Sequence, residues 1–397
     1  MQSDNPSSIK TKTAFHRKKL SYLVVAHIAN DSCFGFLSPI IPILKEMLNI
    51  PLSFVGFLGP TLAATGALGQ PIFGMIADRF QKNWLLALGP ILGGLISFAT
   101  TVNSIPVLFI LLFIAGLGSA CFHPIASVRA VQFSGNRKGL GVSIYIAGGR
   151  LGVSLGAAMA TFVVTRFGVE GLPYTCLVVF FVGFLLFFLN LDSEQKVQKK
   201  LPKKNPIDIR SLVLVFRSLM GLWFVNYFRT VVTMSISFYL SIYLIEKGNS
   251  FADGGFSISF FLFAAAIGGI FGGYLSDLFG RRLVIIFSLL IGTPCIGISL
   301  YSDDIFFRLL FLILAGAAFY SQMGVSVTYA QEIIPEHAAL ASSFMLGVVW
   351  FCSSLTMPLI GVIADHFGIL IVMPVSCLIF GTLGLLLALR LPKLENF

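Results

Sequence analysis

The stretch GYLSDLFGRR (273–282) lies where a long apolar segment ends at an acid and another begins after two arginines. A looser copy, GMIADRFQKN (74–83), has Asp78 where the later stretch has Asp277. The two acids are 199 positions apart (277 − 78), which is half of the 397-residue chain. A charged turn that recurs at half the chain length between apolar segments predicts a duplicated bundle of membrane-spanning helices.

The composition of the whole chain indicates the same class of protein. Hydrophobic residues make up 56% of the chain and charged residues 11%, with a mean hydropathy of +0.91, so there are too few charges to cover a water-soluble surface. Apolar runs recur along the sequence, each long enough to cross about 30 Å of hydrocarbon. The 39 glycines suit closely packed helices in lipid. We therefore expect an all-α integral membrane protein.

The apolar runs predict twelve spans in two pseudo-symmetric six-helix bundles. A cytoplasmic tail (1–19) precedes the N-terminal bundle (20–191), and a polar cytoplasmic linker (192–210) leads to the C-terminal bundle (211–390) and a short cytoplasmic tail (391–397). The spans are expected at about 20–44, 54–78, 84–103, 106–131, 139–165, 172–191, 211–245, 255–276, 283–301, 305–331, 337–364 and 368–390.

The basic residues predict the orientation of the bundle. With the N-terminus inside, inner loops and tails carry 19 of the 27 Lys and Arg residues, and outer loops carry four. This bias satisfies the positive-inside rule, so both termini and both charged turns are expected on the cytoplasmic side of the inner (plasma) membrane. The net charge of +10 then reflects orientation, and no nucleic-acid partner is expected. The chain is expected to act as a monomer in contact with membrane lipid.

Weaker copies of the charged turn occur at TRFG (165–168) and GVIADHFG (361–368), both on the outer side in this topology. The turn thus recurs about every third helix, with alternating sidedness. This is the pattern expected of inverted three-helix repeats nested within each half.

Both copies of the full turn are candidate gates. Glycines before the turn permit close helix approach, and Asp277 can accept hydrogen bonds from a helix N-terminus or from an arginine across the gate. The paired arginines can meet acidic lipid or partner carboxylates. The alternative is an ordinary topogenic loop. The candidate gate residues are Gly74, Asp78 and Arg79 in the first copy, Asp277, Arg281 and Arg282 in the second, and Glu332 at the inner end of the tenth span.

The segment HIAND in the first span contains the candidate proton site. His27 and Asp31 are four residues apart and share one helix face near mid-membrane. An ionised carboxylate is costly there and must face a cavity or a cationic partner. Asp31 is therefore the candidate for carrying a proton in exchange for substrate, and His27 for tuning or relaying it, because imidazole changes charge near neutral pH. The alternative is a structural polar pair that ties the first helix to a neighbour.

Arginines within the spans indicate the charge of the substrate. Arg150 in the fifth span is too deep to reach water comfortably, so it needs a partner, of which Asp31 is one possibility, or an anionic ligand. Arg229 in the seventh span adds a second deep cation, whereas Arg129 lies near the cytoplasmic end of the fourth span and can snorkel. Three membrane arginines against one deep acid in the N-terminal half favour an anionic substrate.

The fifth span also presents a small-residue face, since Gly148, Gly152 and Gly156 are spaced for a tight helix crossing. Further polar and aromatic residues complete the expected substrate cavity, with a packing role as the alternative. The expected cavity residues are Asn30, His123, Arg129, Arg150, Asn226, Tyr227, Arg229, Tyr329 and Trp350.

Motifs for cofactor chemistry are missing from the sequence. The six cysteines lie in or at the edges of apolar runs and none forms a CxxC pair, so no disulfide, zinc or iron–sulfur centre is expected. No segment resembles a phosphate-binding P-loop, a nucleophile elbow or an HExxH helix. The chain is therefore expected not to be an enzyme and to hold no metal or cofactor. Transport is expected to use an ion gradient or to run downhill.

The pattern G-x-x-x-D-x-x-G-R-R resembles the loop signature of the major facilitator superfamily. The segments HIAND, GQPIFGMIADR, GLGSACFHP, SIYIAGGRLGVSLG and YAQEIIP…GVIADHFG, in this order, resemble the fosmidomycin-resistance branch of its drug exporters. The resemblance implies a central cavity, alternating access and proton-driven antiport of small, often anionic compounds. By position, the functional residues that it implies are His27, Asn30, Asp31, His123, Pro124, Asp277 and Arg281.

Several positions depart from that branch. Ile125 replaces an acid after FHP, and Arg129 comes one position late. In the fifth span Ile146 and Arg150 replace a Gln and an Asn, and Ala157 stands where antiporters have a proline after glycine. The cavity is thus more cationic than is usual in the branch, which fits an anionic substrate such as a polycarboxylate. Together with the resemblance, this favours export of a small anionic compound or drug. The alternatives are proton-coupled import of a carboxylate siderophore or organic acid, and a non-transporting membrane receptor or scaffold.

Overall fold

The computed structural model describes residues 15–80, 84–135, 137–189 and 209–392. Within these ranges the chain forms helices and their connections, without strands. Twelve of the described helical segments are long and apolar enough to cross a membrane, so the expected fold class is confirmed. Most of the expected tails and linker (1–14, 190–208 and 393–397) lies outside the described residues.

The helix bounds differ from the expected spans by a few residues. The N-terminal half contains α1 (Arg17–Met47), α2 (Leu52–Phe80), α3 (Trp84–Gly94), η1 (Leu95–Thr101), α4 (Ile105–Phe133), α5 (Lys138–Phe167), η2 (Val169–Thr175) and α6 (Cys176–Phe188). The C-terminal half contains α7 (Ile209–Glu246), α8 (Phe251–Phe279), α9 (Arg281–Tyr301), α10 (Ile305–Ile333), η3 (Pro335–His337), α11 (Ala338–Ser343), η4 (Phe344–Val348), α12 (Val349–Phe367) and α13 (Ile369–Ala388).

Three spans are not single regular helices. The third combines α3 with the 3₁₀ segment η1, the sixth combines the 3₁₀ segment η2 with α6, and the eleventh combines α11, the π-helical η4 and α12. The helix α10 ends before Pro335, because proline offers no backbone N–H and disfavours a helical conformation at Ile334. The expected span 337–364 agrees with the eleventh span of the structure to within a few residues.

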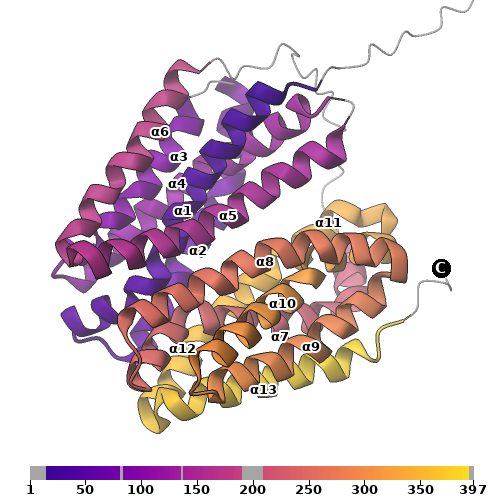
Figure 1. Cartoon of the computed structure of the whole chain (residues 1–397). Coiled ribbons are helices and arrows are strands. Elements are labelled where there is room, and N and C mark those ends of the chain that lie inside the picture. Colours follow the sequence, from indigo (N-terminus) through magenta and orange to yellow (C-terminus); the bar gives the residue numbers. More distant parts are fainter. Residues whose placement is uncertain (1–14, 81–83, 136, 190–208, 393–397) are drawn as a thin grey trace, which may run out of the picture.

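The two halves form two bundles that lie side by side, α1–α6 above α7–α13 in Figure 1. They contact each other through α5 with α8 and α2 with α12. We call the end with the start of α1, the α8–α9 turn and the end of α13 the terminus end. The opposite end, with the α1–α2 and α7–α8 connections, is the far end. Figure 1 shows the halves meeting at the far end, on the left, and separating toward the terminus end.

The helices α1 and α5 cross at backbone distance because glycines leave no side chain between them. A Cβ at Gly152 would lie 2.4 Å from the carbonyl oxygen of Ile28, and a Cβ at Gly156 would lie 1.9 Å from that of Ser32. The small-residue face expected on the fifth span is therefore confirmed, and its partner is α1.

Gly156→Ala is expected to destabilise the folded protein, because the new methyl group would overlap the backbone of α1. Overpacking of this kind costs about 1–3 kcal/mol. The cost is measured as a lower midpoint of thermal unfolding for the purified protein in detergent. Gly324→Ala in α10 is the matched control, since nothing lies within 4 Å of a Cβ at that position. Equal losses in the two variants would contradict the prediction.

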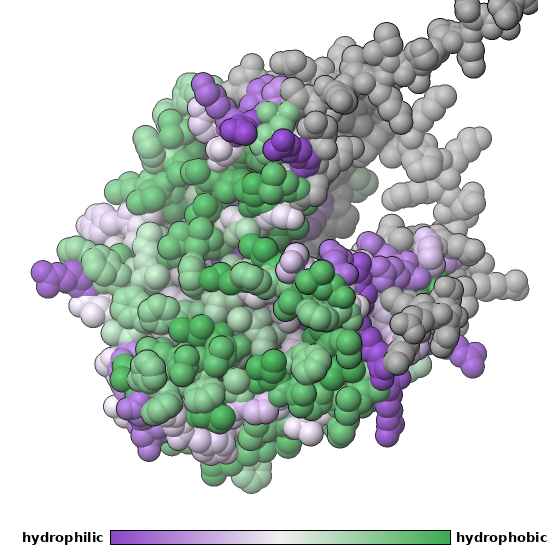
Figure 2. Space-filling model, turned by 45° about the vertical axis from the view of Figure 1, so that its right-hand side comes forward, coloured by the Kyte–Doolittle hydropathy of each residue, from purple (hydrophilic) through white to green (hydrophobic). Residues whose placement is uncertain are grey.

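The outer surface is apolar, as lipid contact requires. Phe181, Phe184 and Phe188 on α6 are each more than half exposed. Figure 2 shows one face on which hydrophobic residues predominate, with hydrophilic residues gathered toward its margins. Burying apolar surface is worth about 25 cal/mol per Å², so side chains of this size are stabilised by transfer from water into hydrocarbon.

Candidate proton and substrate site

A carboxylate lies between two histidines inside the N-terminal half. Oδ2 of Asp31 is 3.1 Å from Nε2 of His27, one turn earlier on α1, and Oδ1 is 3.3 Å from Nε2 of His123 on α4. The side-chain amide of the buried Asn30 donates to the same Oδ1 at 2.9 Å. The structure thus brings together four residues that the sequence selected, and His123 comes from a second helix.

The ring of His27 is held in one orientation. Its Nδ1 lies 2.8 Å from the carbonyl oxygen of Tyr145 on α5, and the two rings stack with their centroids 4.1 Å apart. Gly149 of α5 packs against the pair: a Cβ there would lie 2.4 Å from Nε2 of His27 and 2.6 Å from Oδ2 of Asp31. Glycine therefore leaves the space that the hydrogen-bonded pair occupies.

This geometry requires a proton between His27 and Asp31. A backbone carbonyl can only accept, so Nδ1 of His27 carries a hydrogen. In a neutral ring Nε2 is then an acceptor, and it faces another acceptor unless a proton lies between the two groups. The pair therefore holds one proton, as imidazolium with carboxylate or as imidazole with carboxylic acid.

The same three side chains have the spacing of a metal site. The ligand atoms of His27, Asp31 and His123 lie within 4.8 Å of one another, close enough for one divalent ion. Hydrogen bonds within the cluster already account for these contacts, and we assign no metal to them. The expected lack of a metal or cofactor stays a prediction.

Two arginines approach one aromatic ring at the interface of the halves. The guanidinium carbon of Arg150 on α5 lies 5.2 Å from the ring centroid of Tyr320 on α10, and that of Arg229 on α7 lies 5.8 Å from it. Nη2 of Arg150 also contacts the sulfur of Met323 at 2.7 Å, and Nη2 of Arg229 donates to the Thr230 hydroxyl at 2.9 Å. A ring face attracts a cation without neutralising it, so both charges remain available to an anion.

Buried polar groups on the helices that form the arginine site keep hydrogen-bonding capacity. Nε of the buried Arg229 has no hydrogen-bond partner among the described residues, and neither has the amide of the fully buried Gln322 on α10. The sequence offered Asp31 as a partner for Arg150, but the structure does not pair them, because Asp31 is engaged by the histidines. A guanidinium donor left without an acceptor, with a second guanidinium group on the same aromatic ring, suits an anionic ligand.

The helix α5 links the proton site to the arginine site. Gly149 packs against His27 and Asp31, and Arg150, the next residue, crosses the interface to Met323. The residue that contacts the histidine–carboxylate pair and the arginine that crosses the interface are therefore neighbours on one helix.

Three residues expected in the cavity are buried within their own half. The hydroxyl of Tyr329 donates to the carbonyl oxygen of Pro392, beyond the end of α13. The amide of Asn226 donates to the carbonyl of Leu222, one turn earlier. Arg129, for which snorkelling was weighed, is 6% exposed and so lies inside the half. In this conformation Tyr329 and Asn226 make these hydrogen bonds within the half, and the cavity roles of all three residues stay predictions.

Two aromatic cavity candidates pack against the core of the C-terminal half. The hydroxyl of Tyr227 is 2.7 Å from that of Thr356, and its ring stacks on Trp223 at 5.4 Å. Trp350 on α12 is half-buried against the same core. Neither is brought to the ring of Tyr320 by the contacts described, so their substrate roles stay predictions.

The second charged turn forms an ion-pair network within the C-terminal half. Arg281 pairs with Asp277, four residues earlier, and its Nε is 3.3 Å from Oε1 of Glu332 at the end of α10. Arg282 donates to the carbonyl of Leu389 at 2.7 Å. Asp277 thus meets the arginine of its own turn, and Arg282 meets a backbone carbonyl where a lipid or carboxylate was expected. The network ties α8, α9 and α10 together at the terminus end.

The first charged turn lies at the end of α2. Gly74 faces α4, and a Cβ there would lie 3.8 Å from Cβ of Pro124. Asp78 and Arg79 are helical, but their side chains lie outside the described part of the structure. Their gate role stays a prediction.

An acid that the sequence analysis did not select joins the halves at the far end. Asp365 of α12 accepts hydrogen bonds from the backbone N–H groups of Leu52 at 2.7 Å and Ser53 at 3.0 Å, where α2 begins. A carboxylate at a helix N-terminus satisfies free N–H groups and complements the helix dipole. The only sequence signal for this contact was the weak echo GVIADHFG (361–368).

Asp365→Ala is expected to loosen the far end. Loss of a helix cap costs about 1 kcal/mol, which changes the ratio of open to closed far ends about fivefold. The change is measured as faster maleimide labelling in detergent of Met357→Cys, a fully buried position against which Gly56 of α2 packs. Asp303→Ala is the matched control, because this exposed acid pairs with Lys247 inside the C-terminal half. Equal labelling rates in the two variants would argue against a gating role for Asp365.

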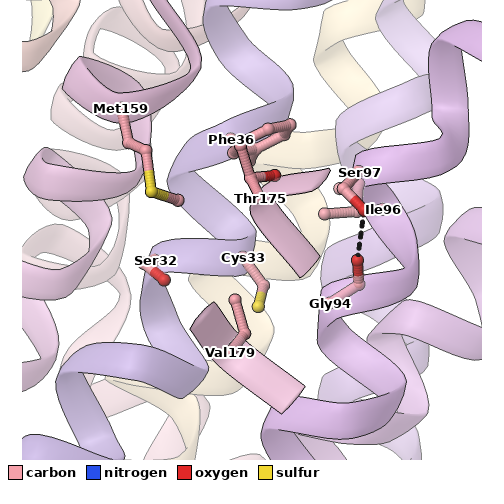
Figure 3. A pocket seen from close by; sticks show the side chains of 9 residues that line it. All are labelled: Ser32, Cys33, Phe36, Gly94, Ile96, Ser97, Met159, Thr175 and Val179. Atoms are coloured by element: carbon pink, nitrogen blue, oxygen red, sulfur yellow. Dashed lines mark hydrogen bonds between the residues drawn. The ribbon is translucent and has the colours of Figure 1, made fainter. Parts of the chain in front are cut away.

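A small pocket lies inside the N-terminal half, and its lining begins directly after Asp31 on α1. Figure 3 shows the lining side chains, with the Ser97 hydroxyl donating to the Gly94 carbonyl at 2.8 Å. The lining residues are Ser32, Cys33, Phe36, Gly94, Ile96, Ser97, Met159, Thr175 and Val179. None of them is charged or approaches the arginine pair, so we interpret the pocket as a packing gap.

Comparison with known proteins finds relatives along the whole chain. The family model of the Major Facilitator Superfamily matches residues 23–350 and 222–396. The fosmidomycin resistance protein of Escherichia coli K12 is 29% identical over 388 residues, which are 96% of this chain and 94% of that protein. The uncharacterised transporter YfnC of Bacillus subtilis is 27% identical over 364 residues, 87% of this chain and 86% of that protein.

Solved structures share the fold at low sequence identity. A bacterial homologue of the human lysosomal transporter Spinster, in an inward-facing and occupied conformation, matches with a TM-score of 0.77 at 16% identity, over 95% of this chain and 97% of that one. The nucleoside transporter NupG matches with a TM-score of 0.75 at 13% identity, over 96% and 99% of the two chains. At these identities the likeness shows the fold alone.

Proposed function

This chain belongs to the Major Facilitator Superfamily of membrane transporters, and from this premise we propose that it is a proton-coupled antiporter. It exports a small anionic organic compound or drug by alternating access. The energy comes from the proton gradient, and the chain works as a monomer without a cofactor.

The adjacency along α5 is the observation that supports this proposal. An anion bound between Arg150 and Arg229 and a proton exchanged in the cluster of His27, Asp31 and His123 act on neighbouring residues of α5, since Gly149 packs against His27 and Asp31. Two sites that bias the same element influence each other's occupancy. Such coupling is what exchange of a proton for a substrate requires.

The proposed direction of transport is taken from the name of a relative. The fosmidomycin resistance protein is named for resistance to a compound, as expected of an exporter. We place the terminus end in the cytoplasm and the protein in the inner (plasma) membrane, because the basic residues concentrate at that end. The halves join at the far end, so in this orientation the described conformation faces inward.

Transport in proteoliposomes tests both the coupling and its sign. The purified protein is reconstituted, a pH gradient is imposed in either direction, and fosmidomycin and a panel of organic anions and cations are offered outside. Antiport predicts accumulation of an anion when the lumen is the acidic side, because protons leave as the anion enters. A protonophore should abolish the accumulation, and protein-free liposomes give the background.

The opposite sign identifies the rival function. Accumulation only with an acidic exterior would mean proton symport, and therefore import of an anion such as an organic acid. The surplus of arginines over acids in the cavity suits an importer as well as an exporter. If no compound on the panel moves in either direction, the proposal is rejected for that panel, and a non-transporting membrane receptor becomes the favoured alternative.

A further inference from the structure

We propose that His123 is the side chain that exchanges protons with the cavity, while the His27–Asp31 pair keeps the proton that it shares. This assignment rests on the proposed proton coupling and names the ring that carries the moving proton. In the binding step Nδ1 of His123 takes a proton and the ring becomes an imidazolium, whose Nε2–H still faces Oδ1 of Asp31. Release on the other side of the membrane restores the neutral ring.

The first observation is that His27 is closed to exchange. It is 5% exposed, its Nδ1 is committed to the carbonyl of Tyr145, and Gly149 packs against its Nε2. If the pair lost its shared proton, the lone pair of Nε2 would face a carboxylate oxygen at 3.1 Å with nothing between them. Unmade hydrogen bonds of buried groups are costly, so the pair retains its proton.

The second observation is that His123 suits both protonation states. Its side chain is 24% exposed, against 6% for His27. A neutral ring with its hydrogen on Nε2 already satisfies the 3.3 Å contact to Asp31. A second proton, on Nδ1, adds attraction to the carboxylate without breaking that contact. A group that gains and loses a proton within one geometry is a suitable exchange site.

The charges around His123 favour one exchanged proton. From α1 it faces Asp31 and His27, whose ring lies 5.2 Å away edge-on, and from α5 Tyr145 stacks behind His27. Its own helix carries the buried Arg129, six residues later. With the shared proton in place the pair is neutral, so protonation of His123 takes the cluster from no net charge to one positive charge.

Titration of the individual histidines tests the assignment without a substrate. The chain has five histidines, so labelling with ¹³Cε1-histidine gives five NMR signals from the full protein in detergent. Gln replacements of His16, His337 and His366 assign three signals, and His123→Gln separates the remaining two. Between roughly pH 5 and 9, where imidazole titrates, the His123 signal should move through the imidazole-to-imidazolium shift, and the His27 signal should stay in place.

His366 is the internal control. Its Nδ1 lies 2.8 Å from the carbonyl of Val362, as that of His27 does from Tyr145, but the residue is exposed. The His366 signal should change with pH, which would show that a hydrogen bond at Nδ1 does not by itself prevent a histidine ring from taking up a second proton. The assignment is overturned if the His27 signal titrates, alone or together with His123, or if the His123 signal stays unchanged over the range.

Transport supplies the second readout. With fosmidomycin as the probe and an acidic lumen, His123→Gln should reduce accumulation to that of protein-free liposomes, whereas His366→Gln should match the original protein. Undiminished accumulation in His123→Gln would overturn the assignment. If the original protein moves no probe, the proposed function fails while the titration result stands, so the two failures are distinguishable.

Discussion

Asp31→Asn is expected to reduce proton-driven flux to the level of protein-free liposomes. The substitution keeps the size of the side chain and one acceptor oxygen, but it removes the charge that holds His27 and His123. Without the carboxylate, the pair has no shared proton and an imidazolium at His123 loses its counter-charge. The measurement is accumulation of substrate under an imposed pH gradient, with insertion and folding checked by gel filtration and thermal unfolding.

Asp303→Asn is the control for this prediction. Its carboxylate also pairs with a base, since it lies 2.9 Å from Nζ of Lys247, but it is exposed at the far end and away from the proton cluster. The Asp303→Asn variant should therefore accumulate substrate like the original protein. If Asp31→Asn is folded and keeps its full accumulation, the role of Asp31 in coupling is wrong.

Arg150→Gln and Arg229→Gln are each expected to weaken binding of the anionic substrate about 10- to 100-fold. A hydrogen bond to a charged group contributes about 1.5–3 kcal/mol, and each 1.4 kcal/mol is about a tenfold change in the dissociation constant. Calorimetry with the anion identified in the liposome panel measures the loss. Replacement by lysine should recover part of the affinity, because the charge stays while the guanidinium fork is lost.

Arg166→Gln supplies the matched control on the same helix. Arg166 lies in the last turn of α5 and is exposed, so its loss should leave affinity unchanged. Equal weakening in all three glutamine variants would point to a general charge effect. Unchanged affinity in Arg150→Gln and Arg229→Gln would remove the basis for an anionic substrate.

The sequence predicted those features that depend on spacing within one helix. The four-residue interval between His27 and Asp31 places them in contact, and the glycine interval on the fifth span makes α5 cross α1 closely. Both follow from helix geometry alone. The twelve spans follow in the same way from the lengths of the apolar runs.

Contacts between helices were less predictable. The sequence is compatible with a packing role for His123 as well as a cavity role, and only the approach of α4 to α1 brings this ring to Asp31. Tyr320, the meeting point of two arginines, has no sequence signal that distinguishes it from other membrane aromatics. Tyr329 was expected in the cavity, and in the structure its hydroxyl donates a hydrogen bond to the carbonyl oxygen of Pro392, beyond the end of α13. These contacts depend on how segments that are distant in the sequence pack against one another.

The arginine pair also has an electrical consequence. Two guanidinium charges lie near the middle of the bundle, and Asp31, the deep acid of the N-terminal half, is engaged by histidines and does not pair with Arg150. Each elementary charge that crosses 100 mV of membrane voltage exchanges about 2.3 kcal/mol with the field. In the proposed antiport the carrier returns with a bound proton, so it presents both arginine charges and the charge of the proton to that field, whereas a carrier loaded with a dianion presents none. Membrane voltage should therefore act on the return of the proton-loaded carrier, and the transport cycle should be electrogenic.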